Sequence, residues 1–263
     1  MRIWKPFAKK ESLSPARETG KKPQLRVFMP RLCGGTFSDL QREAARAVLQ
    51  AKKTADKEKS EAPGIILFSE ICLKYRFTAE PEESQEQLEI MRAMMRKESG
   101  GLWLAAAFCV MEDYGIDDSR STGYLLQQEG GVQKYHKRRL TYGDMEHMDS
   151  IFFSNNNARW RERLEGLKDE PFPSLVTPRG MSVEYRICAD VCSMPLESEP
   201  QAVSVLSSNG NQVGYTLSGI GPLRRMVIEN DAHHGMPTTF ARQAQNYRTD
   251  TLDSGMSLFT LFE

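Results

Sequence analysis

Apolar and polar residues follow two different periods along this chain of 263 residues. The mostly apolar run LRVFM at 25–29 and the run GIILFSE at 64–70 predict strands, the second of them buried on both faces because polar positions do not alternate within it. Between these runs, apolar residues recur at helical spacing and predict a helix that is entered at Thr36 or Ser38. We expect this helix to end in the charged run that starts at Lys52, which completes a β-α-β unit.

The same alternation of elements continues in the middle of the chain. Pro81 suits the first turn of a second helix, whose apolar stripe of leucine and methionine ends at Gly100 and Gly101. We interpret the methionines as core residues rather than a cofactor surface. The run LWLAAAFCVM at 102–111 predicts another buried strand, and the Gly-Gly pair within 123–137 predicts a hairpin.

The pattern becomes irregular over 141–178, where it predicts a polar loop with one helix at 158–167. Alternating residues then predict a strand at 181–188, with a neighbouring strand at 202–208. No internal repeat interrupts this order. A single α/β core is therefore the expected architecture.

The first 22 residues differ in composition from the rest of the chain. They are rich in lysine, serine and proline and have few apolar positions, so we expect residues 1–22 to form a flexible leader and residues 23–263 to form one domain. A targeting or secretion address is the alternative interpretation of this leader, although it has acidic residues and no apolar segment.

Composition excludes several classes of partner. Lysine plus arginine and aspartate plus glutamate number 35 each, so net charge does not direct the chain to nucleic acid or to an anionic membrane. We find no stretch of roughly 18 apolar residues that could span a bilayer. Five cysteines form an odd, scattered set without a CxxC pair, which predicts free thiols in a reducing, cytoplasmic compartment.

Three residues that can perform chemistry each close a predicted strand. Glu70 follows IILFS, Lys137 ends the hairpin in KYHKRRL, and Cys188 ends VEYRIC. A carboxylate at the carboxyl end of a buried strand can accept a proton, an ammonium can stabilise an oxyanion, and a thiolate can attack carbon. Singly, each residue also has an ordinary structural explanation. We interpret Cys72 and Cys109, which lie inside apolar runs, as inert core.

The blocks ILFSE, YHKRRL and YRICAD, in this order, resemble the three signature blocks of the nitrilase, or carbon–nitrogen hydrolase, superfamily. The resemblance covers roughly residues 24–230. It implies an α-β-β-α sandwich in which Glu70 is the general base, Lys137 stabilises the tetrahedral intermediate, and Cys188 is the nucleophile. The implied substrate is a small-molecule amide or nitrile, with neither metal nor cofactor, and the implied assembly is a homodimer.

The resemblance also implies supporting residues. Glu146 is the best match to a second glutamate after the lysine, with Asp144 as the alternative, and the backbone N–H of Ala189 is the expected second oxyanion donor. Asp190 is expected to hold the local turn. The segment LRRMVIEND resembles an arginine-rich, Glu-Asn helix of the family, with Arg225, Glu229 and Asn230 as its matching residues. The chain departs from the family after Cys188, in VCSMPLESEPQAVSVLSSNGNQVG.

Two other functions stay open from the sequence. One is a Cys-His hydrolase or deamidase that pairs Cys188 with His233 or His234. The other is a catalytically silent or secreted effector-type protein that binds a partner through the same fold. The polar leader and the altered segment after Cys188 motivate this second hypothesis.

Overall fold

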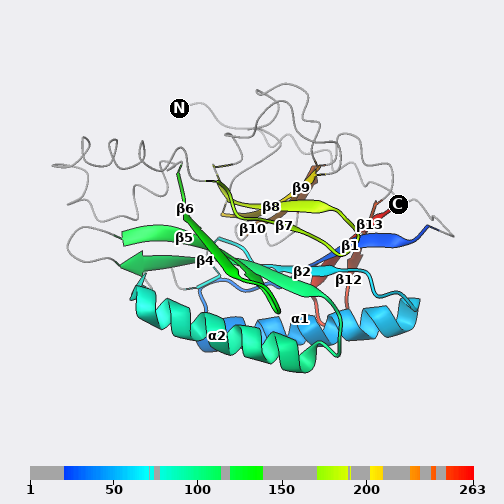
Figure 1. Ribbon diagram of the computed structural model, residues 1–263, viewed down its shortest axis with the longest axis horizontal. Helices are drawn as coiled ribbons and strands as arrows, with labels where there is room; N and C mark the ends of the chain where they lie inside the picture. The colour runs from blue at the N-terminus through cyan, green and yellow to red at the C-terminus, as the bar shows by residue number, and fades with distance from the viewer. Residues whose placement is uncertain are drawn as a thin grey trace, which may run out of the picture.

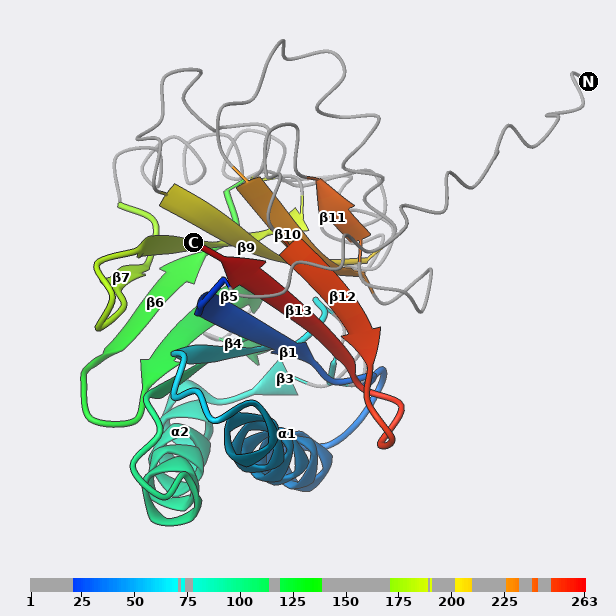
Figure 2. The same cartoon turned by 90° about the vertical axis from the view of Figure 1, so that its right-hand side faces the viewer.

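Two β-sheets lie face to face, and two helices cover the outer face of the larger sheet (Figure 1; Figure 2). The computed structural model describes residues 21–70, 72–73, 78–113, 119–138, 171–188, 190, 202–209, 226–231, 238–240 and 247–263. Within this part the layers run helix, sheet, sheet. The predicted α/β class with two stacked sheets is therefore confirmed for these three layers, while the second helix layer and the helix predicted at 158–167 lie outside the described residues.

The larger sheet has eight strands in the order β12-β13-β1-β2-β4-β5-β6, with β3 paired to β4. Strands β1, β2 and β4 run parallel to one another. The pairs β1–β13, β4–β5 and β5–β6 are antiparallel. Its strands are β1 Pro23–Met29, β2 Gly64–Leu67, β3 Thr78–Ala79, β4 Leu104–Asp113, β5 Ser119–Gln127, β6 Val132–His136, β12 Tyr247–Thr251 and β13 Ser257–Phe262. The hairpin predicted around the Gly-Gly pair is confirmed as β5 and β6.

The smaller sheet has five strands in the order β11-β10-β9-β8-β7. Its three central strands, β8, β9 and β10, are parallel, so their carboxyl ends lie at one edge. The strands are β7 Ser174–Val176, β8 Ser182–Ile187, β9 Ala202–Ser208, β10 Met226–Asp231 and β11 Thr238–Phe240. The predicted neighbour relation between 181–188 and 202–208 is confirmed.

Two apolar layers hold the sandwich together. Between helices and larger sheet, the methionine stripe of the second helix packs with strand residues that include Phe28, Ile66 and Phe108. Between the sheets, alternate residues of the same strands, such as Val27 and Ile65, meet the smaller sheet. Strands β1, β2 and β4 are therefore buried on both faces, which is why they read as continuous apolar runs.

Helix α1 (Phe37–Glu58) begins after Thr36, one of the two expected entry points, and α2 (Pro81–Glu98) begins at the expected proline. Helix α1 ends at Glu58, inside the charged run that starts at Lys52, as expected. The helix continues to Glu58 because Thr54 and Ala55 remain buried while the charged positions face outward.

Two expectations are wrong. The family-like helix in LRRMVIEND is instead strand β10, whose residues from Val227 to Asp231 are all buried. The irregular segment predicted over 141–178 contains strand β7, which pairs with β8. None of the helices in the described part of the chain combines the length and apolarity that a membrane span requires.

Candidate active site

Glu70 and Lys137 form a buried ion pair. Glu70 lies just beyond the carboxyl end of β2, and Lys137 lies one residue beyond the end of β6. Lys137 Nζ donates to Glu70 Oε1 at 2.6 Å, and the two side chains are 1% and 9% exposed. The backbone N–H of Lys137 also donates to Ser121 O at 2.8 Å, which extends the hairpin to the lysine. Two of the three residues predicted to act together are thus in direct contact.

Cys188 follows β8 with a backbone φ of 43°, in the left-handed region. Among the described residues, the other non-glycine residue with positive φ is Lys59, which caps the carboxyl end of α1. The conformation of Lys59 is ordinary for a helix cap, whereas Cys188 does not cap a helix of the described chain. A cysteine held in a disfavoured conformation at a strand end is typical of a functional residue. Its side chain is buried, with 3% exposure.

Two hydrogen bonds between the sheets join the backbone at the ion pair to residues near Cys188. The backbone N–H of Arg138 donates to Asp190 Oδ1 at 3.1 Å, which joins the residue after Lys137 to the turn that follows Cys188. The backbone N–H of Glu70 donates to Ser208 O at 3.3 Å. Because Ile187 aligns with Ser207 in the parallel pair β8–β9, Ser208 lies beside the start of the cysteine turn. The expectation that Asp190 holds this region is consistent with its bond to Arg138.

A buried ion pair is weak support for stability, because desolvation of both charges offsets their attraction. A buried pair of this kind near a potential nucleophile is a candidate functional site. The arrangement can supply a carboxylate that accepts a proton, a cation that faces developing negative charge, and a soft nucleophile.

Supporting contacts come from Ser207 and Tyr185, which the sequence did not single out, and from Asn230, which it placed in a helix. Ser207 Oγ donates to Phe68 O at 2.6 Å and accepts from the Tyr185 hydroxyl at 3.0 Å. Asn230 Nδ2 donates to Leu67 O at 2.7 Å. These bonds fix the last residues of β2 before Glu70. Their signal in the sequence is a polar ending on each apolar strand, in AVSVLSS and MVIEND.

The other described cysteines are Cys33, Cys72 and Cys109. Burial raises the pKa of Cys72 to about 12 and the pKa of Cys109 well above its ordinary value, so both are protonated at neutral pH. The charges of Glu70 and Lys137 also act on Cys109, which places this thiol near the pair. Cys33 is exposed. The interpretation of Cys72 and Cys109 as inert core is consistent with this.

Several predicted residues lie outside the described residues: Ala189, Asp144, Glu146, His233 and His234. Of the remaining histidines, His136 is described. Burial lowers the pKa of His136 to about 4, and its Nδ1 lies 3.0 Å from the Thr122 hydroxyl. In the part of the chain that the structure describes, no group of three histidine, cysteine, aspartate or glutamate side chains could hold a metal ion.

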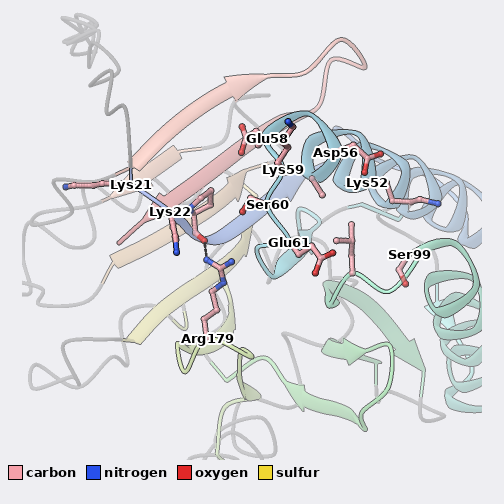
Figure 3. A pocket seen from close by; sticks show the side chains of 14 residues that line it. Lys21, Lys22, Lys52, Asp56, Glu58, Lys59, Ser60, Glu61, Ser99 and Arg179 are labelled. Carbon is pink, nitrogen blue, oxygen red and sulfur yellow. Dashed lines mark hydrogen bonds between the residues drawn. The ribbon is translucent and has the colours of Figure 1, made fainter.

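A separate cavity of about 910 Å³ lies at the opposite end of the parallel strands (Figure 3). Its walls come from the carboxyl ends of both helices and from the residues that precede β1, β2 and β4. Most of its side chains are charged, among them Lys22, Lys52, Glu61 and Arg179. Glu70 follows the carboxyl end of β2, so this cavity is distinct from the candidate active site.

Comparison with solved structures finds matches to an amidase from Nesterenkonia sp., with a TM-score of 0.47 and 13% identity over 92% of this chain and 91% of that chain. A variant of the Nesterenkonia AN1 amidase, from the nitrilase superfamily, has a TM-score of 0.47 and 12% identity over 92% of each chain. Another variant, in complex with butyramide, has a TM-score of 0.45 and 14% identity over 92% of this chain and 91% of that one.

These similar structures are of a nitrilase-superfamily amidase. No protein-family model matches the sequence, and no curated protein matches it.

Proposed function

We propose that the chain hydrolyses non-peptide carbon–nitrogen bonds in a small amide, carbamoyl compound or nitrile, through a cysteine thioester. One observation carries the proposal: the buried Lys137–Glu70 pair, 2.6 Å apart, lies at the sheet edge where the turn of Cys188 is anchored. A homodimer in a reducing, cytoplasmic compartment is part of the same proposal, and light scattering of the purified chain tests the dimer.

For an amide, the first half-reaction forms the thioester. Glu70 accepts the proton of the Cys188 thiol while sulfur attacks the carbonyl carbon, and Lys137 stabilises the oxyanion of the tetrahedral intermediate. The carbon–nitrogen bond then breaks, the proton passes from Glu70 to the leaving nitrogen, and ammonia or an amine departs. An acyl group remains on sulfur.

The second half-reaction restores the enzyme. Glu70 takes a proton from water, the resulting hydroxide attacks the thioester carbon, and Lys137 again stabilises the oxyanion. Collapse releases a carboxylic acid and returns the proton to sulfur. In this scheme the Ala189 N–H is the second oxyanion donor, and Glu146, or Asp144 in its place, orients the substrate.

The proposal is tested by ammonia release from a panel of acetamide, butyramide, an N-carbamoyl amino acid and butyronitrile. Cys188→Ala, Glu70→Gln and Lys137→Met are each expected to lower kcat by about 10³-fold or more, because groups that act as a unit lose their effect together. Cys33→Ala, which removes an exposed cysteine, is the matched control and is expected to keep activity. Folded Cys188→Ala enzyme with wild-type turnover would exclude this mechanism.

Thiol labelling separates the hydrolase from a catalytically silent protein on the same fold. Near neutral pH, iodoacetamide is expected to modify Cys188 faster than Cys72 or Cys109, whose raised pKa values keep them as thiols. Peptide mass spectrometry over time gives the three rates. Equal rates at Cys188 and Cys72 would leave the proposal without its nucleophile and favour the silent, partner-binding protein.

A further inference from the structure

Strands β9 and β10 end in a run of buried polar residues. Ser207 and Ser208 are fully buried, and Glu229, Asn230 and Asp231 are 1%, 6% and 3% exposed. The two strands are parallel, so these residues gather at the edge of the smaller sheet where the Cys188 turn begins. Buried polar groups cost folding free energy unless they are paired, so each of their bonds calls for an explanation.

Two of these residues hold β2 directly. Ser207 and Asn230 donate to the carbonyls of Phe68 and Leu67, across the interface between the sheets. Ser208 and Glu229 lie on the opposite face of their strands, since side chains alternate along a strand. They cannot act on β2 in the same way.

Ser208 instead connects Glu229 to Glu70, through its hydroxyl and its backbone carbonyl respectively. Its hydroxyl donates to Glu229 Oε1 at 2.5 Å, and its backbone carbonyl accepts the N–H of Glu70 at 3.3 Å. The side-chain bond fixes the rotamer and position of Ser208 at the end of β9. The backbone bond then transmits that position to Glu70.

We propose that Glu229 is a positioning residue, which acts through Ser208 to hold Glu70 in place against Cys188 and Lys137. The inference rests on the proposed function, because it assigns Glu229 to the base of that reaction. Glu229 itself contacts neither the ion pair nor, in this proposal, the substrate.

The charge of Glu229 gives the proposal a distinctive signature. Burial is the main cause that raises the pKa of Glu229 to about 8; the bond from Ser208 opposes this shift and the carboxylate of Asp231 adds to it. These are the groups that act on it from β9 and β10. On β8, Arg186 is separated from Glu229 by Leu206 of β9. Its guanidinium donates hydrogen bonds to the Glu184 carboxylate and to Asp190 O. At pH 7 the neutral acid therefore accepts the Ser208 bond, and ionisation above pH 8 places a second charge beside Asp231.

The experiment measures kcat and KM for ammonia release as a function of pH. Glu229→Ala and Ser208→Ala are each expected to lower kcat by roughly 10- to 100-fold, with KM changed less than about 3-fold, because a displaced base slows chemistry more than binding. The double variant is expected to lose no more than either single one.

Glu229→Gln retains an oxygen acceptor for Ser208 but does not ionise. It is expected to keep neutral-pH kcat within about 3-fold and to lack the fall of kcat above pH 8 that we expect of the wild type. Glu58→Gln, which alters a hydrogen-bonded carboxylate at the other end of the sheet, is the matched control and is expected to leave the pH profile unchanged.

Circular dichroism establishes which variants fold. The inference would be overturned by a folded Glu229→Ala enzyme with wild-type kcat, or by a Glu229→Gln enzyme whose kcat falls above pH 8 as that of the wild type does. If Cys188→Ala is inactive in the same assay, the proposed function still holds. Should Glu229→Ala not fold, the pH profile of Glu229→Gln decides. Active Cys188→Ala enzyme overturns the proposed function and the inference with it.

Discussion

At the residue scale, Gly123 on β5 sets how closely the two sheets approach. A Cβ atom at this position would lie 2.7 Å from Tyr135 Cε1, 2.9 Å from Ile187 Cδ1 and 2.9 Å from Tyr185 Cε1. All three side chains are buried, so they have little room to move. The glycine therefore lets β8, and with it the residue before Cys188, sit against the larger sheet.

We expect Gly123→Ala to lower the free energy of unfolding by about 1–3 kcal/mol, the usual cost of overpacking a buried site. It should also lower kcat, because Ile187 is displaced beside the nucleophile. Urea unfolding and ammonia release measure the two effects. Gly131→Ala is the matched control, since a Cβ at Gly131 meets nothing within 4 Å. Equal stability of the two variants would contradict this view of the interface.

Glu229 predicts a pH dependence of stability as well as of rate. Its pKa rises from 4.5 to about 8 on folding, so between these values the folded chain keeps a proton that the unfolded chain has lost. Stability contributed by this group therefore falls as pH rises from 4.5 to 8 and is constant above. The free energy of unfolding of Glu229→Gln, relative to that of the wild type, should therefore rise by about 2–4 kcal/mol between pH 5 and pH 8.5. Thermal melts at both pH values test this; a constant difference would contradict it.

The residues of the candidate site were predictable from the sequence in unequal measure. Glu70, Lys137 and Cys188 stand out because each is a reactive group that directly follows an apolar or alternating strand. Ser208 does not stand out, and Glu229 was predicted only as part of a helix, because their contact depends on the parallel register of β9 and β10, which brings residues 21 positions apart together. Because the two strands are parallel, no tight turn joins them and the local sequence does not reveal which residues pair.

At the element scale, the start of α1 depends on a reciprocal cap. The N–H of Asp39 donates to Thr36 Oγ1 at 3.3 Å, and the N–H of Thr36 donates to Asp39 Oδ2 at 2.8 Å. These bonds satisfy two groups that the first turn would otherwise leave unpaired. The sequence allowed entry at Thr36 or Ser38, and the capping bonds select Thr36.

Thr36→Ala is expected to lower the free energy of unfolding by about 1 kcal/mol, the typical value of an N-cap side chain. For a domain of this size that corresponds to a fall in Tm of roughly 2–4 °C. Ser38→Ala, on an exposed position of the same turn, should change Tm by less than half as much. Calorimetry of both variants makes the comparison, and a larger effect at Ser38 would reassign the cap.

Elements with one strong period were predictable, and elements set by their neighbours were not. Strands β1, β2 and β4 and helix α2 follow from apolar runs and a proline alone. Strand β10 does not, because the six residues of MVIEND suit either period, and pairing with β9 and β11 decides between them. Strand β13 is likewise defined by its long-range pairing with β1.

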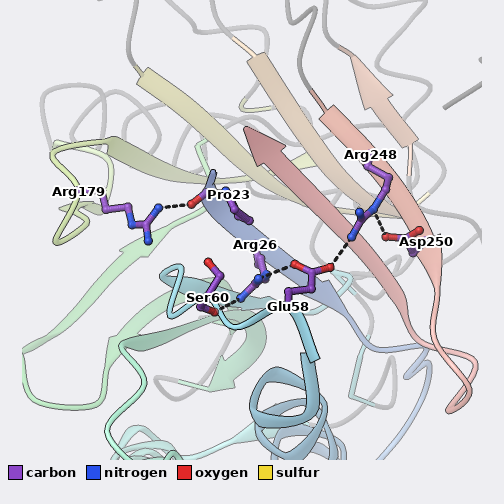
Figure 4. A network of polar contacts seen from close by, with 7 residues as sticks. All are labelled: Pro23, Arg26, Glu58, Ser60, Arg179, Arg248 and Asp250. Carbon is purple, nitrogen blue, oxygen red and sulfur yellow. Dashed lines mark hydrogen bonds and ion pairs between the residues drawn. The ribbon is translucent and has the colours of Figure 1, made fainter. Parts of the chain in front are cut away.

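At the scale of the whole molecule, Glu58 ties distant parts of the larger sheet to the end of α1 (Figure 4). Its carboxylate accepts from Arg26 on β1 and from Arg248 on β12, each at 2.6 Å. The Arg26 side chain is 2% exposed and also donates to Ser60 O at 2.9 Å. Burial favours the neutral form of Glu58, yet the two arginine bonds hold its pKa below the ordinary value. The network thus joins the first and the twelfth strand, at the end of the molecule opposite the ion pair of Glu70.

Glu58→Ala leaves the buried guanidinium of Arg26 without its counter-charge, and removal of one partner from a buried pair costs more than the pair itself contributes. Because Glu58 is 24% exposed, we expect a loss of about 2–3 kcal/mol, below the range for fully buried pairs. Urea unfolding measures this loss of stability. The control is Glu61→Ala, which removes an exposed acid that lines the same charged cavity as Glu58. Since the network lies at the opposite end of β2, kcat of the folded variant should equal that of the wild type. A loss of turnover in proportion to the loss of stability would instead indicate that the two ends of the sheet are coupled.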